Sequence, residues 1–296
     1  MNIPRGIYWD KGITLVDGCT PCSLGCDHCW SASMAHRFKR EGEPGHESGI
    51  LTNYAGSFVD DAPYFNGDIV THPELLSRFN TRMPKVFAIW NDLFHEGVPD
   101  QFILNTFQAI GGQFQNTYLI LTKRPQRMFD VIKRIKPILC AESRAPIGPV
   151  WNNLCFGLTV CNQQEADEKI PIFLQVPGKK FLSIEPVLGA IDLRGLGIKC
   201  PNIGKACGTK NRTGCLTGNC NAGFSFDAVI LGGETGAGAR PMHLDWVRSV
   251  RDQCAEAGVP FFFKGWGKHI PPTQGHNALN GKRNLDGRTH DDLLWK

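Results

Sequence analysis

The sequence predicts an α/β fold, a complete or partial (β/α) barrel of the TIM type. Three observations support this fold: eight short apolar runs, helical patterns between several of them, and polar residues directly after the runs. Strands that alternate with helices are typical of a parallel sheet covered by helices, and in a barrel the carboxyl ends of the strands form the active site. A doubly wound open sheet gives the same alternation and is the second possibility.

The apolar runs are rich in β-branched and aromatic residues, as buried parallel strands are. They lie at 13–16, 68–72, 85–90, 117–122, 153–160, 179–185, 226–233 and 259–266. Helical patterns occupy 99–110, 125–135, 163–175 and 244–257, and Gly258 stands where the last helix should end. We therefore expect a single barrel domain over 1–296, with a C-terminal extension at 268–296.

Composition and charge indicate which classes of protein are compatible with the sequence. The chain has 296 residues, 42% of them hydrophobic, and a net charge of +4, which tolerates a polyanionic partner without requiring one. No run reaches the roughly 18 apolar residues of a membrane span, and the first residues lack an apolar signal segment. We expect a soluble cytoplasmic protein without a membrane partner. Disulfides are rare in that compartment, so grouped cysteines there indicate metal ligands or catalytic groups.

The first cysteine group lies in "GCTPCSLGCDHCW", residues 18–30. Cys22, Cys26 and Cys29 have the spacing Cys-x3-Cys-x2-Cys, which can hold three corners of a [4Fe–4S] cluster and leave one iron open. Cys19 adds a fourth thiol, and a zinc site that uses all four is the alternative.

The second cysteine group lies in a Gly/Asn/Thr-rich insertion at 199–222. A polar loop of this length needs something to hold it, and four thiolates suit either zinc or an auxiliary iron–sulfur cluster. The spacing does not decide between these two. The predicted ligands are Cys200, Cys207, Cys215 and Cys220.

Polar side chains at the ends of the predicted strands form the rest of the candidate site, although any one of them could instead be a helix cap or a turn residue. The candidates for cofactor binding are Asn91, Asp92, Thr122, Lys123, Ser183 and Glu185. The candidates for substrate binding are His72, Arg124, Glu234 and Lys264. Lys123 and Arg124 stand where a helix begins, and there they oppose the helix dipole, which favours a role in binding carboxylate or phosphate.

The first cysteine loop resembles that of the radical SAM enzymes, in which the open iron binds S-adenosylmethionine. A closer resemblance is to a phage- and prophage-associated family of three-cysteine proteins, related to radical SAM enzymes such as spore photoproduct lyase. The segments that carry it are "GCTPCSLGCDHC", "NDLFHEGVPDQF", "LTKRPQRM", "FLSIEPVLGAIDL" and "ILGGETGAGARPMHLDWVRSVRDQCAEAGVPFFFKGWG". The closer family has the pattern Cys-x6-Cys-x2-Cys, which selects Cys19 as the third ligand in place of Cys22.

These resemblances imply a barrel of the radical SAM type and an enzyme that cleaves S-adenosylmethionine to a 5′-deoxyadenosyl radical. The implied activity is that of an isomerase, a lyase or another nucleic-acid-modifying enzyme. The implied substrate is DNA or a modified nucleotide, for example a hypermodified thymine in bacteriophage DNA, and the implied partner is a reductant such as flavodoxin. A phage-encoded protein of this kind would act in the host cytoplasm. The alternative function is a metal-stabilised nucleic-acid-binding protein without catalysis.

Overall fold

The structure is a computed structural model that describes residues 6–37, 52–54, 63–142, 152–194, 196, 226–274, 281–293 and 295. Contacts within the chain divide it into two compact units. The first consists of Met1–Tyr8, Gly157–Glu234 and Arg240–Lys296, and the second of Trp9–Phe156 and Thr235–Ala239. The second unit contains the first cysteine loop.

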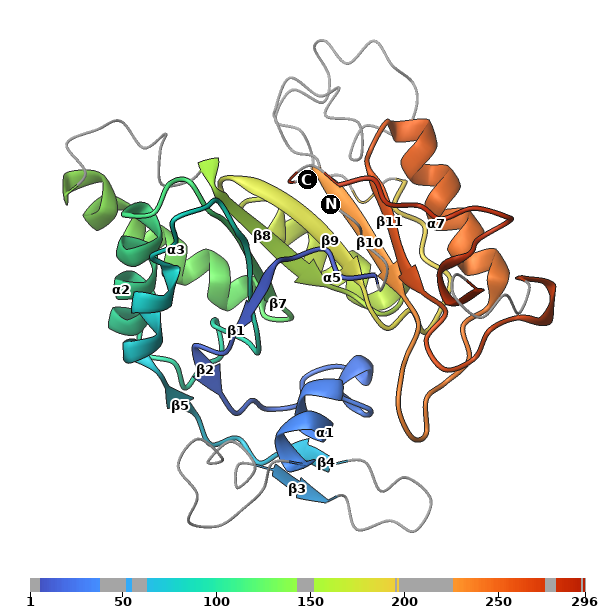
Figure 1. Cartoon of the computed structure of the whole chain (residues 1–296), viewed down its shortest axis with the longest axis horizontal. Helices are drawn as coiled ribbons and strands as arrows, with labels where there is room; N and C mark the ends of the chain where they lie inside the picture. Colours follow the sequence, from blue (N-terminus) through green and yellow to red (C-terminus); the bar gives the residue numbers. More distant parts are fainter. Residues whose placement is uncertain are drawn as a thin grey trace. The chain divides into compact units, whose positions relative to one another are not determined.

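Seven strands form one sheet in the order β1-β6-β7-β8-β9-β10-β11 (Figure 1). Their bounds are Lys11–Ile13 (β1), Val86–Ile89 (β6), Thr117–Thr122 (β7), Leu154–Thr159 (β8), Lys179–Ile184 (β9), Ala228–Gly232 (β10) and Phe261–Gly265 (β11). β1 pairs with β6, β6 with β7, and β10 with both β9 and β11, always in parallel. Since β1 and β11 end this order, the described strands do not close on themselves. The fold is mixed α/β and compatible with a partial (β/α) barrel.

The described helices are α1 (Trp30–Arg37), α2 (Asp100–Gly111), α3 (Pro125–Glu142), α5 (Gln163–Phe173) and α7 (Leu244–Ala257), with 3-10 turns η1 (Leu24–Cys26), η3 (Pro73–Phe79), η4 (Pro272–Gln274) and η5 (Gly281–Arg283). Four of the helices confirm the sequence patterns, although α3 continues beyond the predicted end at residue 135, and α1 was not predicted. α7 ends as expected, because Gly258 adopts the left-handed conformation (φ 64°) that costs glycine little. Asn162 caps α5 by accepting a hydrogen bond from the backbone N–H of Glu165.

The first two predicted strands differ from the structure. Residues 13–16 divide between the end of β1 and a second strand, β2 (Val16–Asp17). The predicted strand at 68–72 was wrong as a member of the main sheet, because only β5 (Val70–Thr71) forms there, and it pairs antiparallel with β2 in a separate ribbon. Val70 is exposed, whereas a parallel strand inside such a sheet is buried on both faces.

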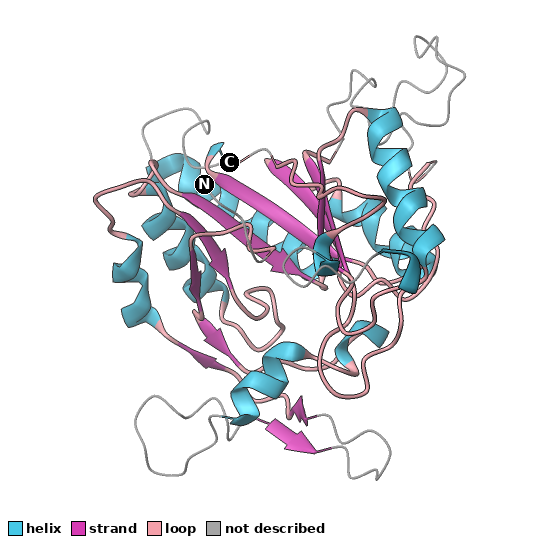
Figure 2. Ribbon diagram, turned by 45° about the vertical axis from the view of Figure 1, so that its right-hand side comes forward, coloured by secondary structure: helices cyan, strands magenta, loops and turns pink. Residues whose placement is uncertain are grey.

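A further hairpin, β3 (Thr52–Tyr54) with β4 (Pro63–Phe65), pairs antiparallel, and α1 lies against it (Figures 1 and 2). In the same unit the rings of Phe79, Phe87 and Tyr118 pack together, with centroids 4.7–5.4 Å apart. This aromatic cluster fixes η3 against β6 and β7, since burying such rings is a large part of core stability.

In the other unit, β9, β10 and β11 are almost entirely buried. The C-terminal residues run along the outer edge of β11, where Phe262 and Asp291 form an antiparallel bridge and the Phe263 N–H donates to the carbonyl of His290 (2.9 Å). The described part of the predicted extension at 268–296 therefore covers an edge strand.

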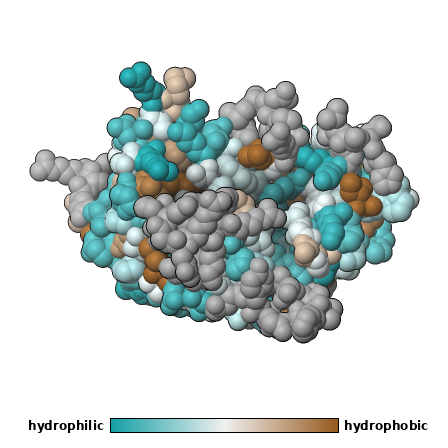
Figure 3. Space-filling view, turned by 60° about the horizontal axis from the view of Figure 1, so that its bottom comes forward, coloured by the Kyte–Doolittle hydropathy of each residue, from teal (hydrophilic) through white to brown (hydrophobic). Residues whose placement is uncertain are grey.

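None of the helices in the described ranges is long and apolar enough to cross a membrane. On the face that Figure 3 draws, hydrophobic residues lie in separate small patches among hydrophilic ones.

Candidate functional site

The first cysteine loop connects β2 to α1 and carries four thiols, none of them in a disulfide. Its centre is the turn η1, whose start is fixed by Ser23, because the Ser23 hydroxyl accepts a hydrogen bond from the N–H of Gly25 (3.1 Å). Cys29 lies directly before α1, and its carbonyl accepts the N–H of Ser33. The loop is therefore held by local structure at its middle and at its end.

The thiols lie in two pairs. Cys22 hydrogen-bonds Cys26, and this bond together with the charge of Lys123 lowers the pKa of Cys26 to about 5, while the pKa of Cys22 is raised. Cys19 and Cys29 pack against the same small apolar cluster, Ala32 with Phe65. Burial, followed by the charge of Asp92, raises the pKa of Cys19 to about 11. Cys26 is thus the more acidic thiol of its pair.

Within the described ranges, no group of three or more His, Cys, Asp or Glu side chains is arranged as a metal site. The chemistry of the loop nevertheless suits an iron–sulfur cluster, which takes soft thiolate ligands. Four thiols lie within eleven positions, and Lys123 and Arg124 place positive charge beside them. The residues that could hold such a cluster are Cys26 and Cys29 with either Cys19 or Cys22.

Arg124 and Asp92 form a buried ion pair at the carboxyl ends of β7 and β6. Arg124 Nη1 donates to Asp92 Oδ2 (2.8 Å), and both side chains are less than one-tenth exposed. The Asp92 carboxylate also accepts from the Thr122 hydroxyl (2.7 Å), from the N–H of Phe94 (3.1 Å) and from that of Lys123 (3.4 Å). With four donors on its two oxygens, Asp92 acts here as a positioning residue.

Arg124 also reaches the cysteine loop. Its Nη2 donates to the carbonyl of Thr20 (2.8 Å), its Nη1 lies 3.8 Å from the Cys19 sulfur, and its Nε donates to Glu96 (2.7 Å). The guanidinium therefore joins a strand end to the loop with several charge-assisted hydrogen bonds, which are the stronger kind.

Asn91 holds the loop at both of its ends. Its Nδ2 donates to the carbonyl of Val16 (2.7 Å), before the loop, and its Oδ1 accepts from the Ser31 hydroxyl (2.5 Å), after it. The backbone of Asn91 is left-handed (φ 60°), a conformation that asparagine tolerates better than most residues. Both ends of its side-chain amide are thus engaged within the protein.

Two histidines near the loop were not among the predicted site residues. His95 Nδ1 accepts the N–H of Gly97 (3.0 Å), so the proton is on Nε2, which lies 2.8 Å from the Thr20 hydroxyl. Burial, followed by the Arg124 charge, lowers the pKa of His95. His28 Nδ1 is buried without a hydrogen-bond partner among the described residues. Its place between two cysteines was the signal that could have singled it out.

Three predicted residues come together in the other unit. The Ser183 hydroxyl donates to Glu185 (3.1 Å), and Lys264 Nζ lies 3.0 Å from Glu185 Oε1. A Cβ on Gly232 would lie only 2.7 Å from that same oxygen, so glycine leaves room for the carboxylate. Burial and the Glu185 charge raise the pKa of Tyr8, whose ring centroid lies 6.0 Å from the Lys264 amine.

Two other predicted substrate-binding residues are engaged in local structure. Glu234 is buried and receives three hydrogen bonds from Arg240, two from its side chain and one from its backbone N–H, at 2.7–2.9 Å. His72 lies at the β2–β5 ribbon, with Nε2 2.9 Å from Asp17 and Nδ1 3.2 Å from Glu74. The predicted ligands of the insertion, Cys200, Cys207, Cys215 and Cys220, lie outside the described residues.

Comparison with known proteins identifies a family for this chain but no activity. Residues 6–294 match the profile of a family described as "Protein of unknown function (DUF5131)". No curated protein and no solved structure matches the chain. Because the match covers almost the whole sequence, the chain belongs to the DUF5131 family.

Proposed function

We propose that this protein is a radical SAM enzyme whose [4Fe–4S] cluster is held by the loop from Cys19 to Cys29. The observation that carries the proposal is the attachment of this loop to the carboxyl ends of β6 and β7, through Asn91 and Arg124. Strand ends of this kind are where (β/α) barrel enzymes position their chemistry. A purely structural metal loop needs no such attachment to strand ends.

The donor set supports a cluster with three protein ligands. The lowered pKa of Cys26 favours the thiolate form that a ligand must have, and Lys123 and Arg124 would offset the negative charge of the bound cluster. Cys26 and Cys29 are the firm ligands in this proposal. Cys19 is preferred over Cys22 as the third, because it packs beside Cys29 and contacts Arg124, whereas Cys22 is exposed. When bound, the cluster would supply the electron that cleaves S-adenosylmethionine to methionine and a 5′-deoxyadenosyl radical.

The chain's own residues would orient the reactants. Lys123 is partly buried at the end of β7 and would pair with a carboxylate or phosphate. Asp92 and Asn91 would act indirectly, by fixing Arg124 and the loop. In the other unit, Glu185 and Lys264 remain candidates for binding cofactor and substrate.

For the substrate we propose a base in DNA, modified or rearranged by the radical. The resemblance to phage proteins supports this class of substrate, and so does Trp30, which follows Cys29 directly and is 46% exposed. An exposed indole can stack on a base, and a base in duplex DNA would have to be extruded to reach it.

Anaerobic reconstitution followed by mass-spectrometric detection of 5′-deoxyadenosine tests the chemistry. The wild-type protein should bind iron and sulfide and release 5′-deoxyadenosine when reduced. Cys26→Ala should lose both properties, whereas Cys140→Ala, which changes a cysteine of α3 away from the loop in sequence, should keep them. A colourless protein that holds only zinc and does not turn over S-adenosylmethionine would overturn the proposal and favour the nucleic-acid-binding alternative.

The substrate is tested separately. Nucleosides from DNA made in cells with and without the active protein should differ in mass or chromatographic retention. Identical nucleosides, together with efficient 5′-deoxyadenosine release, would overturn the DNA substrate and leave the radical chemistry standing.

A further inference from the structure

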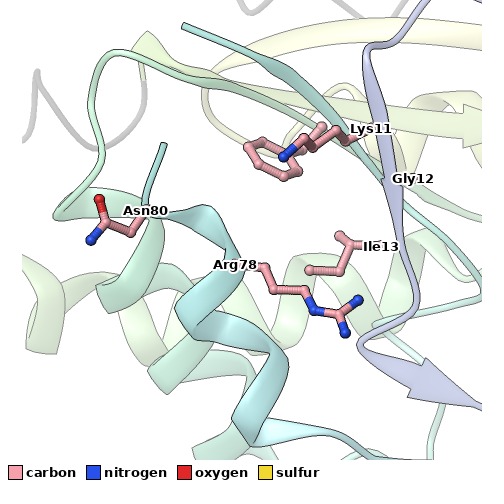
Figure 4. A pocket seen from close by; sticks show the side chains of 6 residues that line it. Lys11, Gly12, Ile13, Arg78 and Asn80 are labelled. Atoms are coloured by element: carbon pink, nitrogen blue, oxygen red, sulfur yellow. The ribbon is translucent and has the colours of Figure 1, made fainter. Parts of the chain in front are cut away.

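A cavity of about 410 Å³ lies within the unit that contains β1 and β6. Its lining residues come from β1, from β6 and from the end of η3: Lys11, Gly12, Ile13, Arg78, Asn80 and Phe87. Figure 4 shows Lys11 and Ile13 extending from β1 toward η3, and Arg78 extending from η3 toward β1. No residue of the cysteine loop is among the lining residues, so the cavity is distinct from the proposed cluster site.

Both charged side chains that line the cavity are cationic. Lys11 and Arg78 are its two charged residues, and neither forms an ion pair within the described part of the chain. Both side chains are exposed, so solvent screens their mutual repulsion, and an anion held near both would be attracted by each charge. The charge of the cavity therefore favours an anionic ligand.

The other lining residues indicate which chemical groups the rest of the ligand would contact. Asn80 offers an amide that can donate and accept hydrogen bonds, and Ile13 and Phe87, which are almost fully buried, contribute a small apolar surface. Phe87 is fixed by stacking on Tyr118 (5.4 Å, 9°), so its wall is rigid. Gly12 must stay without a side chain, because a Cβ there would lie 2.2 Å from the Trp90 ring. The volume lies in the range of small-molecule sites.

We infer that this cavity binds a small phosphate monoester, such as a nucleoside 5′-monophosphate. A phosphate monoester carries close to two negative charges at neutral pH, which Lys11 and Arg78 match, and Arg can bind phosphate through two parallel hydrogen bonds. The organic part would lie against Ile13 and Phe87. This inference goes beyond the proposed function, since binding here needs neither a cluster nor S-adenosylmethionine.

Isothermal titration of the full-length protein with thymidine 5′-monophosphate tests the site, with thymidine as the uncharged comparison. The monophosphate should bind saturably and thymidine should not. The double variant Lys11→Gln with Arg78→Gln should weaken binding by roughly 10- to 100-fold, the range for losing a hydrogen bond to a charged group. Added salt should weaken binding by the wild-type protein, because the contacts are ionic.

Two further variants make the result specific. Arg82→Gln removes an exposed cation that follows η3 but does not line the cavity, and it should keep the wild-type affinity. Asn80→Asp adds a negative charge with little change in shape and should weaken binding as the double variant does. Equal affinity in wild type, double variant and Asn80→Asp would overturn the inference, as would equal binding of thymidine or no saturable binding of the monophosphate.

Discussion

Arg124 donates from its Nη2 to the backbone carbonyl of Thr20 at 2.8 Å, across 104 residues of sequence. This bond joins the end of β7 to the cysteine loop, and Asp92 holds the donating side chain in place from the end of β6. The position of the loop therefore depends on a buried charge pair as well as on the loop's own turns.

The first prediction concerns the third thiol. If Cys19 is the ligand, Cys22→Ala should keep the [4Fe–4S] absorption and S-adenosylmethionine cleavage, while Cys19→Ala should lose both. Iron and sulfide analysis with electron paramagnetic resonance of the reduced protein measures this. The reverse pattern would assign the site to Cys22, Cys26 and Cys29.

The second prediction concerns Asn91. Asn91→Ala loses two hydrogen bonds and leaves alanine in a left-handed backbone, so the free energy of unfolding should fall by about 2–4 kcal/mol. Asn91→Gly should cost less, because glycine accepts that backbone. Urea unfolding measures both, and hydrogen exchange over 17–31 should rise.

A matched control for Asn91 lies on α2. Asn105→Ala removes an exposed asparagine that pairs with Gln101, and it should leave stability nearly unchanged. If Asn91→Ala were no more destabilising than Asn105→Ala, the two bonds would not hold the loop.

The third prediction concerns the Asp92–Arg124 pair. Asp92→Asn should destabilise the protein by about 3 kcal/mol, because it leaves Arg124 buried without its charge partner. The double variant Asp92→Asn with Arg124→Gln should lose less than the sum of the two single changes. Arg194→Gln, which breaks an exposed pair with Asp192, should cost under about 1 kcal/mol. Additive losses at Asp92 and Arg124 would show that the pair is not coupled.

The fourth prediction concerns Lys180, a buried lysine at the start of β9 whose pKa is lowered to about 8 by burial. The folded state then binds fewer protons than the unfolded chain between pH 8 and 10.5, so this residue's contribution to stability rises with pH across that window. Lys180→Met should flatten this rise and stabilise the protein at pH 7 by up to about 3 kcal/mol. Urea unfolding from pH 7 to 10 measures it, and an unchanged slope would contradict it.

Local sequence signals predicted most of the elements but not the short first strands. Runs such as 117–122 and 226–233 are apolar over a whole strand length, and α7 carries its own stop at Gly258, so these elements could be read without knowledge of their neighbours. The run at 68–72 has the composition of a strand, yet its pairing with β2 depends on distant residues.

The candidate site, too, could be predicted from the sequence only in part. Adjacent parallel strands place the residues after β6 and β7 together, which is why Asp92, Thr122 and Arg124 could be grouped from the sequence. Their individual roles could not be predicted. An asparagine or carboxylate at a strand end gives the same sequence pattern whether its side chain binds a ligand or a group of the protein. Asn91 and Glu234 were expected to bind ligands, and each is engaged by partners within the protein.

The strip of chain along the outer edge of β11 also bears on how the protein behaves at high concentration. β11 carries three consecutive phenylalanines, Phe261 to Phe263, and a bare edge of that composition is a template for strand addition by another copy. In this protein the backbone of β11 is instead paired with the chain's own C-terminal residues, through the bridge to Asp291 and the hydrogen bond to His290. The C-terminal residues thus cover this edge, and a chain that ends before residue 281 should self-associate more strongly through the exposed edge of β11.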